Sequence, residues 1–180
     1  MEYKEGDVLW RDYKVIDVKR GGFGIVYICY SPEWDDKVAI KSIQDIYYKF
    51  VGGDAEKFVN SFYTEAETWI KLGKHDNIVE AHFVVDLDYK LHVLMEYVED
   101  GDLKEKLAHN KLSIPDALFF AIQFCDGMIY ANSVDLDGGR RGIVHRDIKP
   151  SNIMFANSEV VKITDFGLVK VLSEVAEGEP

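Results

Sequence analysis

Cysteine and long apolar runs are scarce in this chain of 180 residues. Its two cysteines, Cys29 and Cys125, lie far apart and form no C-x-x-C pair. They therefore give no support for a disulfide framework, a thiolate metal site or redox chemistry. No run of about 18 apolar residues occurs, so no transmembrane helix is expected, and residues 1–5 lack the apolar core of a signal peptide. We expect a cytoplasmic protein with reduced structural thiols.

Positive charge is also in short supply. Lys and Arg number 21 against 32 Asp and Glu, which gives a formal net charge of −11. This balance argues against nucleic acid or an anionic membrane as the main partner, and it leaves a locally built phosphate site open. With 47% apolar and 29% charged residues, the chain has the composition of a globular protein that buries a core. Its length fits one domain, with room for two lobes.

The most informative stretch is His-Arg-Asp-Ile-Lys-Pro-Ser-Asn at 145–152, followed by Asp-Phe-Gly at 165–167. Two short apolar runs, 153–155 and 160–163, lie between these motifs and predict a β-hairpin. Because a hairpin brings its two ends together, the residues just outside it become neighbours.

Those neighbours are Asn152 and Asp165. An amide oxygen and a carboxylate oxygen at one place suit Mg²⁺, which prefers oxygen ligands and shares phosphate groups with its substrate. Asp147 would lie beside the metal, where a substrate hydroxyl loses its proton. The pattern therefore predicts phosphoryl transfer.

The two motifs resemble the catalytic loop and the metal-binding triplet of the protein kinase family. The Asp-x-Lys-x-x-Asn pattern, with Lys149 at its centre, resembles the serine/threonine branch. Motifs in this order and at this separation favour a kinase over a loop whose charges merely solvate a turn. The resemblance implies that Asp147 accepts or orients the hydroxyl proton and that Lys149 neutralises charge on the transferred phosphoryl group. It gives His145 and Phe166 a structural, packing role.

Three strands are predicted before the first long helix, because β-branched and aromatic residues dominate there. They are 13–18, 25–30 and 38–43. The first turn carries Gly21, Gly22 and Gly24, whose missing side chains let backbone N–H groups approach phosphate oxygens. It resembles the kinase glycine-rich loop, except that Lys19 stands where the first glycine belongs. Nucleotide binding is expected to survive this departure.

Lys41 is predicted to lie on a strand face between apolar neighbours, where a lysine must reach solvent or find an anion. Its strand resembles the kinase Val-Ala-Ile-Lys motif, which implies that Lys41 holds the α- and β-phosphates of ATP. The same resemblance places Ala39 and Val26 against the adenine ring.

Residues 55–72 predict a helix with a buried stripe. The stripe consists of Phe58, Phe62, Ala66, Trp69 and Ile70. Glu65 points to the same side as the stripe, whereas Glu67 points to solvent. An inward carboxylate needs a partner, and the kinase resemblance pairs it with Lys41. The alternative is a solvated glutamate at the helix edge.

Strands at 79–86 and 91–97 complete a predicted antiparallel sheet of five strands. The segment 95–102 resembles the kinase hinge, and the resemblance implies further adenosine contacts. These come from Met95 behind the adenine, the backbones of Glu96 and Val98 at its edge, Asp102 at the ribose and Met154 below the ring. The alternative for both methionines is plain core packing.

A second long helix is predicted after Ser113, which with Asp116 forms a variant of the capping box. Its expected buried stripe is Leu118, Ala121, Ile122, Cys125, Met128 and Ile129. Cys125 is accordingly expected to be a small core residue. Arg140 and Arg141 follow in a loop that is either solvated or a docking patch, and a solvated loop is favoured.

The resemblance implies an α+β, bilobal kinase-like fold. The N-lobe, 1–97, would hold the five-stranded sheet and one long helix, and 98–180 would form a partial, mainly helical C-lobe. No Ala-Pro-Glu follows Gly167. The chain is expected to be a fragment of a longer kinase, with ATP and Mg²⁺ as cofactors and protein Ser or Thr hydroxyls as substrates. Ser173 offers a weak phosphorylation site.

Three alternatives stay open. The chain could be a natural truncation that binds nucleotide without transfer, or a second chain could complete the C-lobe. A small-molecule phosphotransferase shares the Asp and Asn spacing, but Lys149-Pro150-Ser151 and the glycine-rich turn argue against it.

Overall fold

The computed structural model describes residues 2–21, 24–43, 55–87, 90–109, 111–135 and 142–166. The chain divides into two compact units. The first comprises the residues up to Glu67 together with Ala81–Tyr97, and the second comprises Thr68–Glu80 together with the described residues from Val98.

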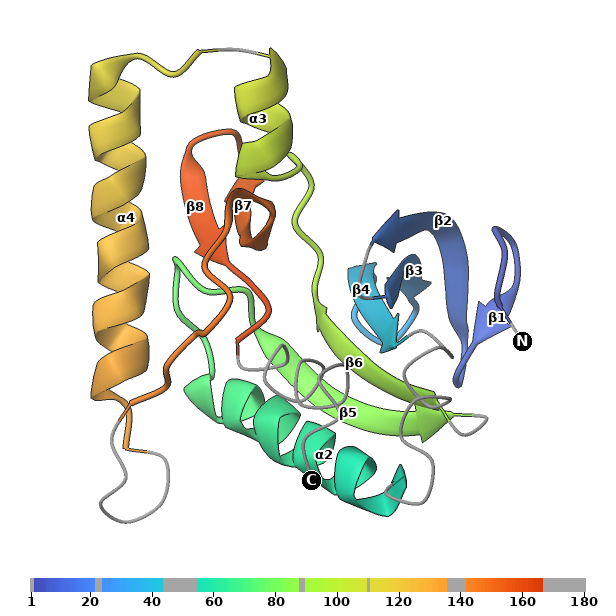
Figure 1. Ribbon diagram of the computed structural model, residues 1–180. Coiled ribbons are helices and arrows are strands. Elements are labelled where there is room, and N and C mark those ends of the chain that lie inside the picture. Colours follow the sequence, from blue (N-terminus) through green and yellow to red (C-terminus); the bar gives the residue numbers. More distant parts are fainter. Residues whose placement is uncertain are drawn as a thin grey trace. The chain divides into compact units, whose positions relative to one another are not determined.

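The first unit is built on a curled antiparallel sheet with the strand order β1-β2-β3-β4-β6-β5 (Figure 1). The strands are β1 (Val8–Leu9), β2 (Tyr13–Gly21), β3 (Gly24–Ser31), β4 (Asp36–Ile43), β5 (Ala81–Leu87) and β6 (Lys90–Glu96). The prediction of five strands is corrected to six. The additional strand, β1, has two residues and pairs with the start of β2, and two residues are too few to produce a period-two pattern. Each of the other five overlaps a predicted strand.

One face of this sheet carries the hydrophobic core of the first unit. Its buried members are Leu9, Tyr13, Val15, Ile25, Tyr27, Cys29, Val38, Ile40 and Leu94. Cys29 is fully buried, and burial raises the pKa of its thiol to about 12. Its thiol therefore stays protonated and unreactive, as expected for a structural cysteine. Because successive side chains of a strand point to opposite faces, the residues between these core members lie on the other face of the sheet.

Helix α2 (Ala55–Leu72) has the predicted bounds; it begins in the first unit and ends in the second. Three residues of its predicted stripe, Phe62, Ala66 and Trp69, are buried. The indole Nε1 of Trp69 donates a hydrogen bond of 2.9 Å to the carbonyl oxygen of Val79. The Phe58 side chain lies outside the described residues.

The second unit contains the predicted hairpin, formed by β7 (Ile153–Ala156) and β8 (Val160–Ile163). Its turn residues Asn157 and Ser158 have φ angles of 52° and 59°, which lie in the left-handed region that reverses the chain direction in short turns. The hairpin is preceded by the short 3₁₀ helix η2 (Pro150–Asn152). Helix α3 (Leu103–His109) was not predicted.

Helix α4 (Ile114–Ser133) lies alongside β8 (Figure 1). Its N-terminus is capped as predicted, because the backbone N–H of Asp116 donates to Ser113 Oγ at 3.2 Å. Gln123 joins the helix to the hairpin. Its Oε1 accepts from the Val161 N–H at 3.0 Å, and its Nε2 donates to the Glu159 carbonyl at 2.8 Å.

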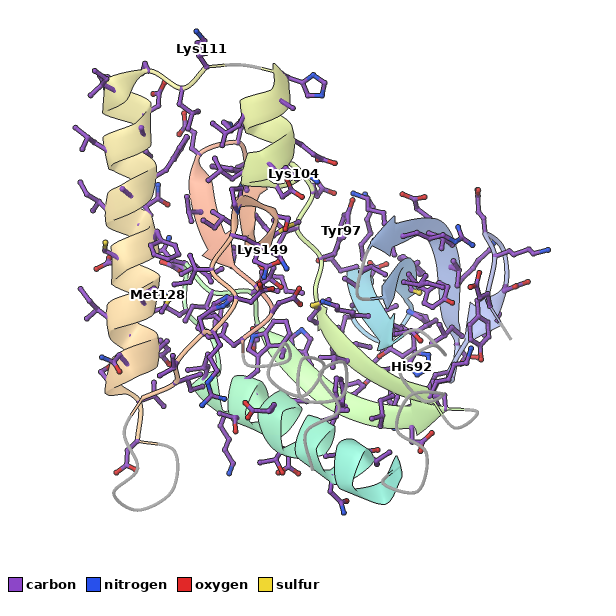
Figure 2. The ribbon with its side chains drawn as sticks, in the orientation of Figure 1. His92, Tyr97, Lys104, Lys111, Met128 and Lys149 are labelled. Carbon is purple, nitrogen blue, oxygen red and sulfur yellow. The ribbon has the colours of Figure 1, made fainter. Side chains whose placement is uncertain are left out.

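The predicted buried stripe of α4 is wrong. Leu118, Ile122 and Ile129 are 60%, 66% and 67% exposed, and Cys125 is exposed as well. The buried residues of the helix are the small Gly127 and Ala131. Apolar residues lie on most sides of this helix, so their helical spacing did not identify the buried face. The small residues Gly127 and Ala131 lie on the buried face, because they allow the helix to approach the hairpin closely. Figure 2 shows side chains projecting from α4 on the side away from the hairpin.

By length and composition alone, α4 is long and apolar enough to cross a membrane. Its mean hydropathy reaches 1.2 over an 18-residue window, of which 11% is buried. The expectation that no segment could form a transmembrane helix is therefore qualified by α4. The hydrogen bonds of Gln123 attach α4 to the hairpin of the second unit.

Candidate active site

The inner face of the first unit, meaning the sheet face opposite its hydrophobic core, carries four predicted ATP-binding residues. Val26 on β3 lies directly opposite Lys41 on β4, and Ala39 lies directly opposite Met95 on β6. Directly opposed residues project from the same side of a sheet, and so do residues two apart on one strand. The register therefore gathers these four side chains on one face. Ala39 and Met95 are buried, whereas Lys41 is half-buried.

The glycine-rich turn joins two strands of the same sheet. Gly21 ends β2 directly opposite Gly24, which begins β3. Among the described residues, a Cβ on Gly21 would meet only the Gly24 carbonyl oxygen, at 3.9 Å, so no described atom crowds Gly21. Gly22 lies outside the described residues, and its role stays a prediction.

Glu65 is half-buried on α2, and Glu67 is exposed as predicted. A half-buried carboxylate is what an ion pair with the strand lysine requires. The pairing of Glu65 with Lys41 stays a prediction. Glu96 ends β6 directly opposite Val38.

The predicted hinge residues of the second unit are tied to the hairpin. The Asp100 N–H donates to the Phe155 carbonyl at 3.1 Å, and the Phe155 N–H donates to the Gly101 carbonyl at 3.0 Å. This pairing brings Asp102 next to Met154 in an isolated β-bridge. The two residues that are predicted to contact the ribose and the adenine are thus neighbours in the second unit.

Two hinge residues have structural roles that the sequence did not indicate. Asp102 Oδ1 accepts a hydrogen bond of 2.8 Å from the Glu105 N–H, so Asp102 caps α3. Val98 is buried. The adenosine contacts of both residues stay predictions.

The catalytic loop places two predicted residues, Lys149 and Asn152, around the carboxylate of a third, Asp147. Asp147 Oδ2 accepts from Lys149 Nζ at 2.5 Å and from Asn152 Nδ2 at 2.8 Å. Figure 2 labels Lys149 in the loop that leads into β7. Two donors on one oxygen hold the carboxylate in one orientation. This is the arrangement that a residue receiving or orienting a hydroxyl proton needs.

The predicted metal ligands lie at the foot of the hairpin. The Thr164 N–H donates to the Asn152 carbonyl at 3.0 Å, which brings Asp165 within one residue of Asn152 across the strands. The side-chain Nδ2 of Asn152 is committed to Asp147, so its Oδ1 is the atom that remains for a cation. A neutral oxygen beside a carboxylate fits Mg²⁺, and these residues can hold that metal.

His145 organises the loop from inside the second unit. Its ring is 1% exposed, Nδ1 accepts from the Asp147 N–H at 3.2 Å, and Nε2 lies 2.8 Å from the Thr164 carbonyl. The ring also packs against Phe166, with 4.7 Å between centroids. Burial lowers the pKa of His145, while the Thr164 carbonyl and the carboxylates of Asp165 and Asp147 oppose that shift. The predicted packing of His145 with Phe166 is confirmed.

Several other predicted features fall outside the described residues. They are Arg140, Arg141, Gly167 and Ser173. No structural statement is made about them, and their roles stay predictions.

The chain belongs to the protein kinase family, because the protein kinase domain family matches residues 15–177. Its curated relatives include a probable serine/threonine-protein kinase of Clostridium acetobutylicum, 31% identical over 94% of this chain and 24% of the relative. Another is the probable serine/threonine-protein kinase PknB of Lactococcus lactis, 31% identical over 95% of this chain and 26% of the relative. The chain thus spans about a quarter of the length of these relatives.

Solved structures show the same fold. One crystal structure of the Mycobacterium tuberculosis PknI kinase domain matches with a TM-score of 0.71 and 25% identity over 93% of this chain and 64% of that one. A second crystal structure of the same domain matches with a TM-score of 0.72 and 23% identity over 99% of this chain and 68% of that one. The predicted kinase-like α+β fold is therefore confirmed, with six strands in place of five.

Proposed function

We propose that this protein transfers phosphoryl groups from ATP to serine or threonine hydroxyls of protein substrates, with Mg²⁺ as the metal. The observation that carries the proposal is the Asp147 carboxylate, held by Lys149 and Asn152 in a chain of the protein kinase family. Serine/threonine kinases among its relatives support the choice of hydroxyl. Its two widely separated cysteines support a reducing, cytoplasmic location.

Each residue has a definite task in this proposal. Lys41, held by Glu65, binds the ATP phosphates, and Asn152 with Asp165 holds the metal, which offsets phosphate charge. Asp147 receives or orients the proton of the attacking hydroxyl, a role worth about 10²–10⁴-fold in rate. Lys149 stands beside Asp147 and neutralises charge that develops on the transferred group.

Calorimetry with Mg·ATP, followed by a radiolabelled transfer assay on a generic Ser/Thr substrate, tests the proposal. Asp147→Asn should bind nucleotide with unchanged affinity and lose transfer. Asp126→Asn, which removes an exposed carboxylate from α4, is the matched control and should behave as the unmodified chain. Unchanged transfer in Asp147→Asn would overturn the role of Asp147, and no Mg·ATP binding by the unmodified chain would overturn the function itself.

A nucleotide-binding module without transfer is the second candidate. One observation favours it: large apolar side chains of α4 face solvent among the described residues. We propose that further protein, from the same polypeptide or a second chain, covers that face. Binding of Mg·ATP without transfer by this chain, restored by a longer polypeptide, would support both statements.

A further inference from the structure

Lys19 and Lys41 lie in one row across the sheet of the first unit. Lys19 on β2 is directly opposite Val26 on β3, and Val26 is directly opposite Lys41 on β4. Directly opposed side chains project from the same face of an antiparallel sheet, so all three belong to the inner face. Two strand spacings separate the lysine backbones by about 10 Å. Flexible four-carbon stems can bring both ammonium groups to one anion.

The next residue, Arg20, has the opposite environment. It is directly opposite Ile25, a member of the hydrophobic core. Arg20 therefore belongs to the outer face, which is the sheet face that carries the hydrophobic core. Its guanidinium donates to Glu2 Oε2 at 3.0 Å. Lys19 is exposed, and its ammonium makes no hydrogen bond or ion pair with any residue that the structure describes. Of the two adjacent cations Lys19 and Arg20, only Arg20 is paired with a carboxylate among the described residues.

We propose that Lys19 is a second phosphate-binding cation of the nucleotide site and contacts a nucleoside di- or triphosphate together with Lys41. The proposal rests on the proposed function, which assigns the inner face to the nucleotide. Two lysines on one face repel each other, and a polyphosphate anion between them removes that repulsion. Adenosine carries no phosphate and gains nothing from Lys19. The lysine at this glycine position is therefore a functional substitution and not only a tolerated one.

Calorimetry of the 180-residue chain with Mg·ATP, Mg·ADP and adenosine tests this assignment. Lys19→Gln removes the charge and keeps a polar side chain, Lys19→Arg keeps the charge, and Arg20→Gln removes the neighbouring outer cation. Lys19→Gln should weaken Mg·ATP and Mg·ADP about fivefold at low salt and leave adenosine unchanged. Lys19→Arg and Arg20→Gln should match the unmodified chain. The difference should shrink as salt is raised, because exposed charges are screened.

Equal ATP affinity in Lys19→Gln and the unmodified chain would overturn the role of Lys19. An equal loss for adenosine would also overturn it, because the effect would then be structural. Thermal unfolding of each variant shows whether the exposed substitution leaves the fold intact, and Lys19→Gly should reproduce the loss with the family's own residue. Mg·ATP binding that needs Lys41 but not Lys19 would refute this inference alone. An unmodified chain that binds no Mg·ATP would refute the proposed function as well.

Discussion

The side-chain amide of Asn152 holds Asp147 by two hydrogen bonds. Its Nδ2 lies 2.8 Å from the carboxylate Oδ2 and 2.9 Å from the carbonyl oxygen of Asp147, and the Asn152 residue is only 4% exposed. One amide therefore orients the carboxylate through its nitrogen and faces a cation with its oxygen. The predicted base and the predicted metal site share this side chain.

Asn152→Ala should impair both functions at once. The substitution removes a predicted metal ligand and one of the two side-chain donors to the Asp147 carboxylate. Phosphoryl transfer should therefore fall on the order of 100-fold, and the Mg²⁺ concentration for half-maximal nucleotide binding should rise. A magnesium titration of nucleotide binding and of transfer measures both effects. Asn132→Ala, which changes an exposed amide on α4, should alter neither. An unchanged magnesium requirement in Asn152→Ala would exclude Asn152 as a ligand.

Gln123 is expected to stabilise the second unit. Its Oε1 accepts from the Val161 N–H and, at 3.2 Å, from Asn77 Nδ2, and its Nε2 donates to the Glu159 carbonyl. Gln123→Ala leaves these groups without their partner and should lower the free energy of unfolding by about 1–3 kcal/mol. Urea unfolding measures the change. Asp126→Ala, at an exposed position on the same helix, should cost much less; an equal cost would show that the network adds nothing beyond helix propensity.

The positions of five strands along the chain and the hairpin at the catalytic loop could be predicted from the sequence, because β-branched runs bounded by turn residues are local signals. Asn152 and Asp165 were brought together by that hairpin alone. The contact of Gln123 with Asn77 could not be predicted in this way, since 46 residues separate them. It depends on how α4 packs, and periodicity does not report that packing.

Helix α4 shows the same limit more sharply. Its length and its Ser113 cap follow from local residues, whereas its orientation depends on which side permits close approach. Large apolar residues suggested one face, and the smallest residue, Gly127, determined another. The two-residue strand β1 was missed for a different reason, because two residues are too few to produce a period-two pattern.

Gly127→Ala should destabilise the protein although it improves helix propensity by about 1 kcal/mol. An added Cβ would lie 2.8 Å from the Asn77 carbonyl oxygen and 3.0 Å from Ile163 Cδ1. The carbonyl cannot yield easily, because it already accepts a 2.9 Å hydrogen bond from the Ile163 N–H. Overpacking of this kind costs about 1–3 kcal/mol, so the melting temperature should fall. Ser133→Ala at the exposed end of α4 provides the comparison, and a higher melting temperature for Gly127→Ala would contradict the close approach.

His145 should make the stability of the second unit depend on pH. Burial lowers the pKa of His145 in the folded protein, whereas an unfolded histidine titrates near about 6.5. Between these two pKa values the unfolded chain binds more protons, so stability rises with pH in that window. The contribution of the neutral ring is fully present above the unfolded pKa and is lost as the pH falls below it towards the folded pKa. Protonation also removes the acceptor that Nδ1 offers to the Asp147 N–H.

Urea unfolding at several pH values between neutrality and mild acid measures this dependence. The unmodified chain should lose stability as the pH falls below about 6.5, and His145→Asn should be less stable at neutral pH but lose less on acidification. His109→Asn, at an exposed position on α3, controls for histidine content and should retain the slope of the unmodified chain. Because the unmodified chain and His145→Asn differ in no other titratable group, the difference in slope between them belongs to His145. Equal slopes in all three would mean that the pKa of His145 does not change on folding, which would contradict the desolvation of its ring.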